Sequence, residues 1–169
     1  MPSPPSFAPG TRLTAARLGF LVQPPLARLR QTVAQAIPNI TATALTFTTE
    51  VVDNDIDGVG GHSTTTNTTR WTARYPGWYR VSGGCAFANN STGFRLLSWS
   101  VNGSIIPGVD VLLAAVSGNT TRIPARTAVI YLNEGDYLEL KAYQSSGGSL
   151  NTAVGSDEQA SMDVLWVSA

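Results

Sequence analysis

The sequence has very few of the residues that build covalent, metal or catalytic sites. Its 169 residues include a single cysteine, Cys85, and a single histidine, His62. A single cysteine excludes an intrachain disulfide. One cysteine and one histidine together are too few ligands for a Cys/His metal centre. No serine lies in a Gly-x-Ser-x-Gly turn, and a lone loop histidine makes turn contacts more often than it joins a triad. The sequence therefore predicts a protein that is not an enzyme.

Charge is scarce and unevenly placed. Charged residues make up 13% of the chain, and Lys141 is the only lysine beside ten arginines. Residues 1–40 contain four arginines and no acid, whereas the remainder contains seven bases and eleven acids. A basic segment on an acidic body predicts docking on another protein. Four arginines spread over this length are too sparse to indicate a nucleic-acid partner.

The sequence also lacks a long apolar run. No stretch is long enough to predict a membrane span, and the N-terminus has no signal-peptide pattern. We therefore expect the protein to be made in a cytoplasm.

Residues 1–29 differ from the rest of the chain in composition and in expected secondary structure. Prolines dominate residues 1–10, which predicts an extended arm that becomes ordered against a partner. Thr14 is placed to cap a short helix over residues 15–20, and residues 26–30 are expected to restart a helical turn. We expect residues 1–29 to be an N-terminal anchoring arm and residues 30–169 to be one domain.

The stretch Arg70–Gly83 shows the clearest strand pattern. Apolar and polar residues alternate before and after Pro76-Gly77, which predicts two strands joined by a tight turn. Trp71 and Tyr79 are expected in the core. Three arginines of the same stretch are expected on the outside, namely Arg70, Arg74 and Arg80.

Short strands follow one another through the rest of the chain. Turn residues separate them, and Asn102-Gly103 is the strongest hairpin signal. About ten strands at this spacing predict an all-β fold, an antiparallel sandwich or jelly roll. Besides the central pair, strands are expected near 31–35, 43–51, 94–101, 109–116, 127–132, 137–143 and 161–167.

The central stretch resembles a known signature. Trp71-Thr72-Ala73 and Tyr75-Pro76-Gly77-Trp78-Tyr79 are similar to the aromatic-x-Ala-x-x-x-Gly-x-Tyr pattern of complement globular-head and tumour-necrosis-factor-like (TNF-like) jelly rolls. Ser100–Gly103, Leu132–Leu140 and Met162–Val167 follow in the order that this family requires. The resemblance implies a ten-stranded jelly roll that assembles as a homotrimer, with aromatic residues near the three-fold axis.

A second resemblance lies at the N-terminus. Residues 10–18, Gly-Thr-Arg-Leu-Thr-Ala-Ala-Arg-Leu, resemble the opening of small virion proteins of tailed phages that infect actinobacteria. This resemblance implies a phage virion protein without enzymatic activity, a tail-tip or fibre-like component that faces the host surface. The alternatives are a capsid decoration protein and, further away, a cell-encoded carbohydrate-binding module. The expected partners are further copies of the chain, other virion proteins through residues 1–29, and a host surface glycan or protein.

Two further sets of residues are candidates for binding. Asp53, Asp55 and Asp57 precede Gly58 in the pattern that opens a calcium loop, although Thr64 stands where such a loop has glutamate. Calcium is thus the one possible cofactor. Three loops are candidates for facing the host, namely Asp53–Thr69, Asn89–Gly93 and Gln144–Ser156. Three strand tryptophans, Trp78, Trp99 and Trp166, are expected in the core or in a subunit interface.

Overall fold

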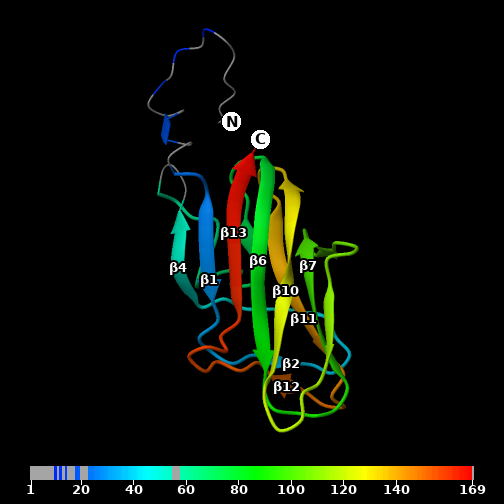
Figure 1. The fold of residues 1–169 in the computed structure, drawn as a ribbon. Coiled ribbons are helices and arrows are strands. Elements are labelled where there is room, and N and C mark those ends of the chain that lie inside the picture. The colour runs from blue at the N-terminus through cyan, green and yellow to red at the C-terminus, as the bar shows by residue number, and fades with distance from the viewer. Residues whose placement is uncertain are drawn as a thin grey trace.

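The computed structural model describes residues 10, 12, 14, 18–19, 23–54 and 58–168. These residues form two packed antiparallel sheets (Figure 1). The five-stranded sheet has the order β10-β6-β13-β1-β4. Its strands are β1 (Leu26–Arg30), β4 (Thr49–Asn54), β6 (Gly77–Phe87), β10 (Thr121–Leu132) and β13 (Ser161–Ser168).

The six-stranded sheet covers one face of the first. It has the order β3-β11-β7-β8, with β5 also paired to β11 and β9 also paired to β7. A small ladder of β2 (Ala36–Ile37) and β12 (Leu150–Asn151) lies at one end of the sandwich (Figure 1). The strands of the six-stranded sheet are β3 (Thr43–Ala44), β5 (Trp71–Thr72), β7 (Phe94–Val101), β8 (Ser104–Ile105), β9 (Val111–Ala114) and β11 (Tyr137–Gln144).

Large aromatic side chains fill the space between the sheets. Trp71 and Tyr79 are both buried, as predicted, and their rings meet edge to face at 5.3 Å. Their polar atoms are satisfied, since Tyr79 Oη donates to Tyr75 O at 2.7 Å and Trp71 Nε1 donates to Asp53 Oδ1 at 2.9 Å. Trp99 is fully buried and donates from Nε1 to Arg126 O on the other sheet at 2.7 Å. Buried aromatic rings with bonded polar tips fix how the two sheets pack.

The strands on either side of Pro76-Gly77 are not a hairpin, contrary to the prediction. β5 pairs with β11 in the six-stranded sheet, whereas β6 pairs with β10 and β13 in the other sheet. The turn therefore carries the chain across the sandwich. Gly77 has φ +149, and a Cβ there would lie 2.4 Å from Ser168 O, so the crossing requires glycine.

Three further predictions about the early chain are wrong. Residues 26–30, expected to form a helical turn, are strand β1, and the expected strand at 31–35 is irregular. The sheet thus begins at Leu26, before the expected start of the domain at residue 30. The expected single strand 43–51 is split between β3 and β4, because the chain crosses from one sheet to the other there. Alternation alone does not reveal such a crossing, since Leu45 and Phe47 stay buried throughout it.

The Asn102-Gly103 hairpin is confirmed, and it is tied to a second turn. Asn102 and Gly103 both have positive φ, +52° and +80°, as a type I′ turn requires. The Asn102 amide donates from Nδ2 to Asp136 Oδ1 at 2.8 Å, and its Oδ1 accepts from Tyr137 N at 3.0 Å. The hydrogen bond from Asn102 and those from Asn133 hold the pKa of Asp136 below its usual range.

Replacing Asn102 by glycine is expected to raise the pKa of Asp136, because glycine keeps the positive φ and removes the amide. A carboxylate with a lowered folded-state pKa adds stability at neutral pH that is lost as pH falls through that pKa. The variant should therefore unfold about 1–2 kcal/mol more easily near neutral pH. It should lose less stability than the wild type on acidification. An NMR titration of the Asp136 carboxyl and melting curves across acid pH check this. An unchanged Asp136 titration contradicts it.

The sandwich has two distinct ends. The chain enters β1 beside the end of β13, where Trp166 N donates to Pro25 O at 3.0 Å (Figure 1). At the opposite end lie the connections from β6 to β7 and from β11 to β12, together with the β2–β12 ladder (Figure 1). Residues 26 and 168 thus share one end of the molecule, and two of the candidate loops lie at the other.

Candidate assembly surface

The outward face of the five-stranded sheet exposes large apolar side chains. Trp78, Val129, Tyr131 and Val167 are 44%, 56%, 46% and 51% exposed. Strand alternation places them opposite the core residues Tyr79, Ile130 and Leu132. Trp78 and Tyr131 are paired across strands β6 and β10, and their rings meet edge to face at 5.4 Å. We call this surface, together with Arg80 and Leu165, the open face.

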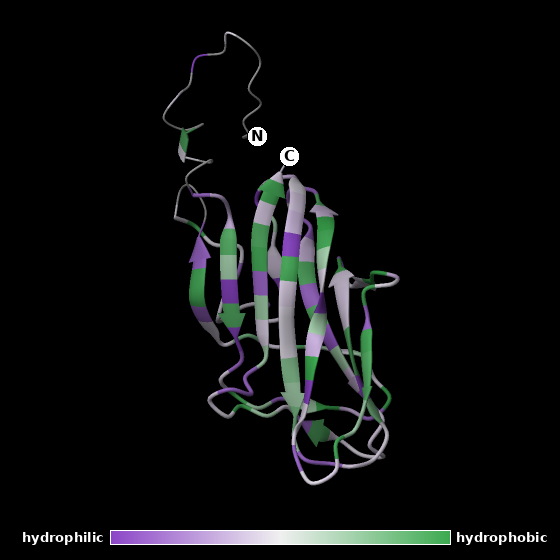
Figure 2. Ribbon diagram, in the orientation of Figure 1, coloured by the Kyte–Doolittle hydropathy of each residue, from purple (hydrophilic) through white to green (hydrophobic). Residues whose placement is uncertain are grey.

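A second apolar surface borders the first. β9 pairs with β7 along one side, and β10 of the other sheet lies next to it. Figure 2 shows apolar residues along β9 and along the upper part of β10. The exposed fractions of this β8–β9 edge are 38–53%, for Ile105, Leu112, Leu113 and Val116. The open face and the β8–β9 edge therefore meet at β10.

The open face is hollowed between β6, β13, β1 and β4. The hollow has a volume of about 380 Å³, and its lining includes Leu26, Val52, Arg80 and Leu165. An ion pair crosses its floor, with Arg28 Nε 3.3 Å from Asp163 Oδ1. The hollow thus combines apolar side chains with an ion pair on the outer surface of the sheet.

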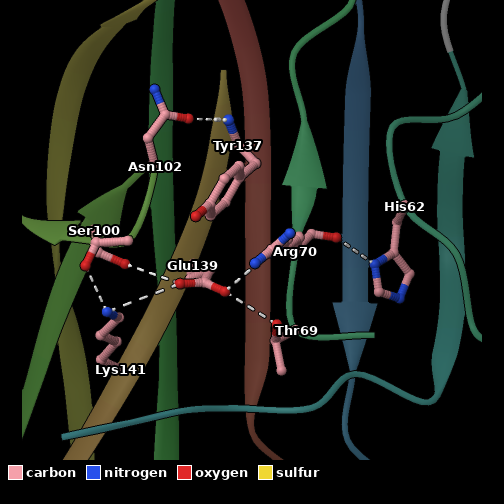
Figure 3. Close-up of polar contacts among 9 residues, drawn as sticks. His62, Thr69, Arg70, Ser100, Asn102, Tyr137, Glu139 and Lys141 are labelled. Atoms are coloured by element: carbon pink, nitrogen blue, oxygen red, sulfur yellow. Dashed lines mark hydrogen bonds and ion pairs between the residues drawn. The ribbon is translucent and has the colours of Figure 1, made fainter. Parts of the chain in front are cut away.

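A polar network holds the segment before β5 against the six-stranded sheet. The Glu139 carboxylate is buried and accepts from Thr69 Oγ1 at 3.0 Å (Figure 3). Arg70 Nε lies 3.4 Å from the same Glu139 oxygen, and its guanidinium stacks 4.0 Å from the centre of the Tyr137 ring. Ser100 Oγ lies 3.4 Å and Lys141 Nζ 3.9 Å from the second Glu139 oxygen. Every charge of this cluster has a partner, so its evident role is to fix the segment.

His62 makes structural contacts, as the sequence predicted. Its Nδ1 lies 2.7 Å from Arg70 O and its Nε2 lies 3.1 Å from Phe47 O (Figure 3 shows the first contact). Both partners are carbonyl oxygens, which only accept, so a neutral ring donates to one of them and only a ring with both nitrogens protonated donates to both. With both nitrogens against backbone carbonyls, the ring is not oriented toward a nucleophile.

The predicted calcium ligands fall partly outside the described residues. Asp55 and Asp57 are not described, and Asp53 lies at the end of β4. Asp53 Oδ2 accepts from His62 N at 2.7 Å, and its other oxygen accepts from Trp71. Within the described ranges, no group of three His, Cys, Asp or Glu side chains is placed to hold a metal. Calcium binding stays a prediction.

The three candidate loops do not gather in one place. Gly93 and Ser145 are in contact, and Phe94 N donates to Ser145 Oγ at 3.0 Å, so Asn89–Gly93 and Gln144–Ser156 lie together. The described part of Asp53–Thr69 instead runs beside β5, where Thr72 N donates to Gly61 O at 2.8 Å. Two of the three loops thus form one end of the molecule.

Comparison with known proteins identifies the fold. No family model and no curated protein matches the chain. The crystal structure of murine APRIL is similar with a TM-score of 0.60 and 11% identity, over 85% of this chain and 98% of that one. Eiger TNF from S. frugiperda is similar with a TM-score of 0.58 and 11% identity, over 85% and 92%. The chain has a TNF-like jelly-roll fold. At this identity the likeness shows the fold alone.

Sequence reasoning identified only part of this jelly roll's open face, because it expected Arg80 outside, as observed, but placed Trp78 in the core or in an interface without deciding between them. Of the four tryptophans, Trp99 is in the core as predicted, Trp166 is half-buried and Trp78 is exposed. Val129 and Tyr131 were expected only as parts of an apolar strand. The available signal was the run Ala128–Leu132, which is apolar at every position and so indicates a strand covered on both faces.

In the described part of the jelly roll, no helix is long and apolar enough to cross a membrane. The thiol of Cys85 is buried, and this burial raises its pKa, as expected of a small core residue.

Proposed function

We propose that this protein is a non-enzymatic structural component of a tailed-phage virion and that it works as a homotrimer. Its role is that of a tail-tip or fibre-like component, anchored by residues 1–29 and facing the host surface. The observation that carries the proposal is the exposed aromatic pair Trp78–Tyr131, on an apolar surface that continues onto the β8–β9 edge. Large exposed apolar patches on a folded protein mark interaction sites.

The arrangement of the two apolar surfaces favours a ring over a two-fold dimer. A two-fold dimer uses one patch twice and leaves a second patch exposed, whereas a ring joins one patch to a different patch on the next copy. Here the open face and the β8–β9 edge are different surfaces that meet at β10. Rotation about a line near β10 brings the open face of one copy against the edge of the next. Val129 and Tyr131 then lie close to the axis, as the TNF-like resemblance implies.

The two ends of the sandwich support an anchored, outward-facing particle component. The chain enters β1 at Leu26, at the end that also holds the end of β13, and the loops Asn89–Gly93 and Gln144–Ser156 lie at the other end. In a ring whose axis follows the strands, all copies present these loops on the same side. A glycan or protein on a host surface is the proposed partner for this side.

The test combines mass, location and anchoring. Light scattering of the purified protein at micromolar concentration should give three times the chain mass of 17.8 kDa. Quantitative mass spectrometry of purified particles should find a few trimers per particle, whereas a copy number near that of the capsid protein would assign it to capsid decoration. Deleting residues 1–23 leaves β1 intact and should abolish incorporation into particles without changing the trimer. A monomer overturns the trimer, and absence from particles overturns the virion role.

A further inference from the structure

Arg80 stands out on the open face because it is a charge among apolar neighbours. It is exposed, and in the register of the sheet it lies between Val129 of β10 and Leu165 of β13. Among the described residues, no carboxylate forms an ion pair with it and no hydrogen bond from its side chain is present. Arg28, on the same face, has Asp163 as its partner. Arg80 is therefore a charge on this face, as are Arg30 and Arg126, for which the described chain supplies no ion-pair partner.

If another protein chain covers the open face, the Arg80 guanidinium loses its contact with water. A guanidinium that is removed from water without an anionic partner costs several kcal/mol in general, and it is tolerated when a carboxylate meets it. If a second copy of the chain covers the open face, that copy must bring a carboxylate to Arg80. The TNF-like fold alone does not say which one.

Three acids of the described chain have neither an ion pair nor a side-chain hydrogen bond, namely Glu50, Asp110 and Glu134. Glu50 is on β4, at the edge of the five-stranded sheet farthest from β10. Glu134 is in the turn between β10 and β11, at the end of the sandwich. Asp110 is exposed and immediately precedes β9, so it belongs to the β8–β9 edge. Asp110 is thus the unpaired acid on the second apolar surface.

The height of Asp110 along the strands can be followed through the hydrogen bonds between them. Val111, the next residue, pairs with Leu97 of β7, which places Asp110 level with the middle of β7. Trp99 of β7 donates from Nε1 to Arg126 O of β10 at 2.7 Å, which ties the middle of β7 to the middle of β10. Asp110 and Arg126 therefore lie at nearly the same height.

Arg80, on the open face, lies at a similar position along the strands. Arg126 is in the bulge of β10, and Ala128, just past this bulge, pairs with Val81 of β6. Arg80 precedes Val81 and pairs with Val129, so it lies a short distance from Arg126 toward the C-terminal end of β10. A ring of identical copies around an axis parallel to the strands keeps every residue at its own height. In such a ring, Asp110 of one copy and Arg80 of the next lie at similar positions along the axis, so the two can pair without a shift of one copy past the other.

We propose that Arg80 of one copy forms an ion pair with Asp110 of the neighbouring copy and that this pair fixes the register of the ring. The inference rests on the trimer of the proposed function and names the charges that hold it. Around the pair, the apolar residues of the open face cover Leu112 and Leu113 of the neighbour. An ion pair enclosed by apolar contacts adds specificity, because a shifted or inverted arrangement leaves two charges buried alone.

A charge swap tests the pair. The variants are Arg80→Glu, Asp110→Arg and the double variant with both changes, and the control is Glu134→Arg, which also reverses an exposed unpaired acid. Sedimentation over a concentration series gives the association constant of each. Each single reversal should lower the constant at least about tenfold, and the double variant should recover to within about threefold of the wild type. The control should match the wild type.

The outcomes separate the pair from the trimer. A wild-type chain that is monomeric overturns the trimer itself. A trimeric wild type with unaffected single variants, or a double variant no better than the singles, overturns the pair and leaves the trimer standing. Should a reversal prevent folding, the neutral set Arg80→Gln, Asp110→Asn and their combination replaces it. For a true pair the combination costs no more than either single change, whereas additive losses contradict it.

Discussion

Replacing Trp78 by glutamate is expected to convert the proposed trimer into folded monomers. Trp78 is 44% exposed and points away from the core, so the change removes little of what holds the sandwich together. In the assembly, however, it puts a carboxylate where two aromatic rings from β6 and β10 meet the next copy. Aromatic residues at the centre of an interface commonly contribute at least about 2 kcal/mol each, which is about thirtyfold in the association constant per interface.

The measurement is sedimentation equilibrium together with thermal melting. The Trp78 variant should sediment with the mass of one chain at concentrations where the wild type is trimeric. Its near-ultraviolet dichroism should keep the signature of the buried rings of Trp71, Tyr79 and Trp99. Val33→Glu is the matched control, because Val33 is 62% exposed but lies outside both apolar surfaces. If the Trp78 variant keeps the trimer mass, as the Val33 control should, the open face is not the interface.

Replacing Arg95 by alanine is expected to cost about 2–4 kcal/mol of unfolding free energy and to release the loop Asn89–Gly93. Arg95 is fully buried at the end of the core, with its guanidinium 5.6 Å from the centre of the Phe87 ring. It donates to three backbone carbonyls of the loop region, Asn90 O at 2.8 Å, Thr92 O at 2.9 Å and Phe94 O at 3.1 Å. Burial lowers the pKa of Arg95, and no carboxylate of the described chain pairs with it.

A second variant separates packing from tethering. Arg95→Met keeps much of the volume against Phe87 and should recover part of the lost stability, because a buried cation without a carboxylate is costly to retain. It removes the three donors, so the amides of residues 90–94 should exchange with deuterium at least about tenfold faster in both variants. Arg122→Ala is the control, because its exposed guanidinium lies on Asp157 and Glu158 and it should change the melting temperature far less. If Arg95→Met keeps wild-type protection in the loop, the tether is not what orders it.

The loop result bears on function as well as stability. Asn89–Gly93 lies with Gln144–Ser156 at the end of the molecule that we propose faces the host. A buried cation that fixes three loop carbonyls keeps this end in one shape, which reduces the entropy lost on binding a partner. A loosened loop should therefore weaken attachment even where the trimer is intact.

The all-β class and most strands of this protein were predictable because the signals are local. The period of two from Trp71 to Val81 identified the residues that are buried, and Asn102-Gly103 identified the hairpin, since both depend only on neighbours along the chain. The wrong predictions for residues 26–30, 31–35 and 43–51 all lie where the chain enters the sandwich or crosses between the sheets. Residues such as Phe47, in the segment that passes from one sheet to the other, are buried like the core residues of either sheet. Their hydrophobicity therefore does not show in which sheet the chain lies.

The candidate site was less predictable than the fold. The sequence suggested that strand tryptophans would be in the core or in an interface, but it did not separate Trp99, which is buried, from Trp78, which is exposed. The outward face of a strand is defined by what packs on the other face, and that depends on residues distant in the chain. The same holds for Arg80 and Asp110, whose similar positions along the strands are visible only after β6, β7, β9 and β10 are in register.

The sequence by itself determined that the chain builds an all-β core without disulfides, because composition and alternation act residue by residue. Only the tertiary structure decided that strands on either side of Pro76-Gly77 belong to different sheets and that Trp78 and Tyr131 meet on an uncovered surface. Both depend on long-range pairing, in which a strand finds its neighbours through the shared core rather than through its own residues. The surface left exposed by that pairing is where the proposed assembly takes place.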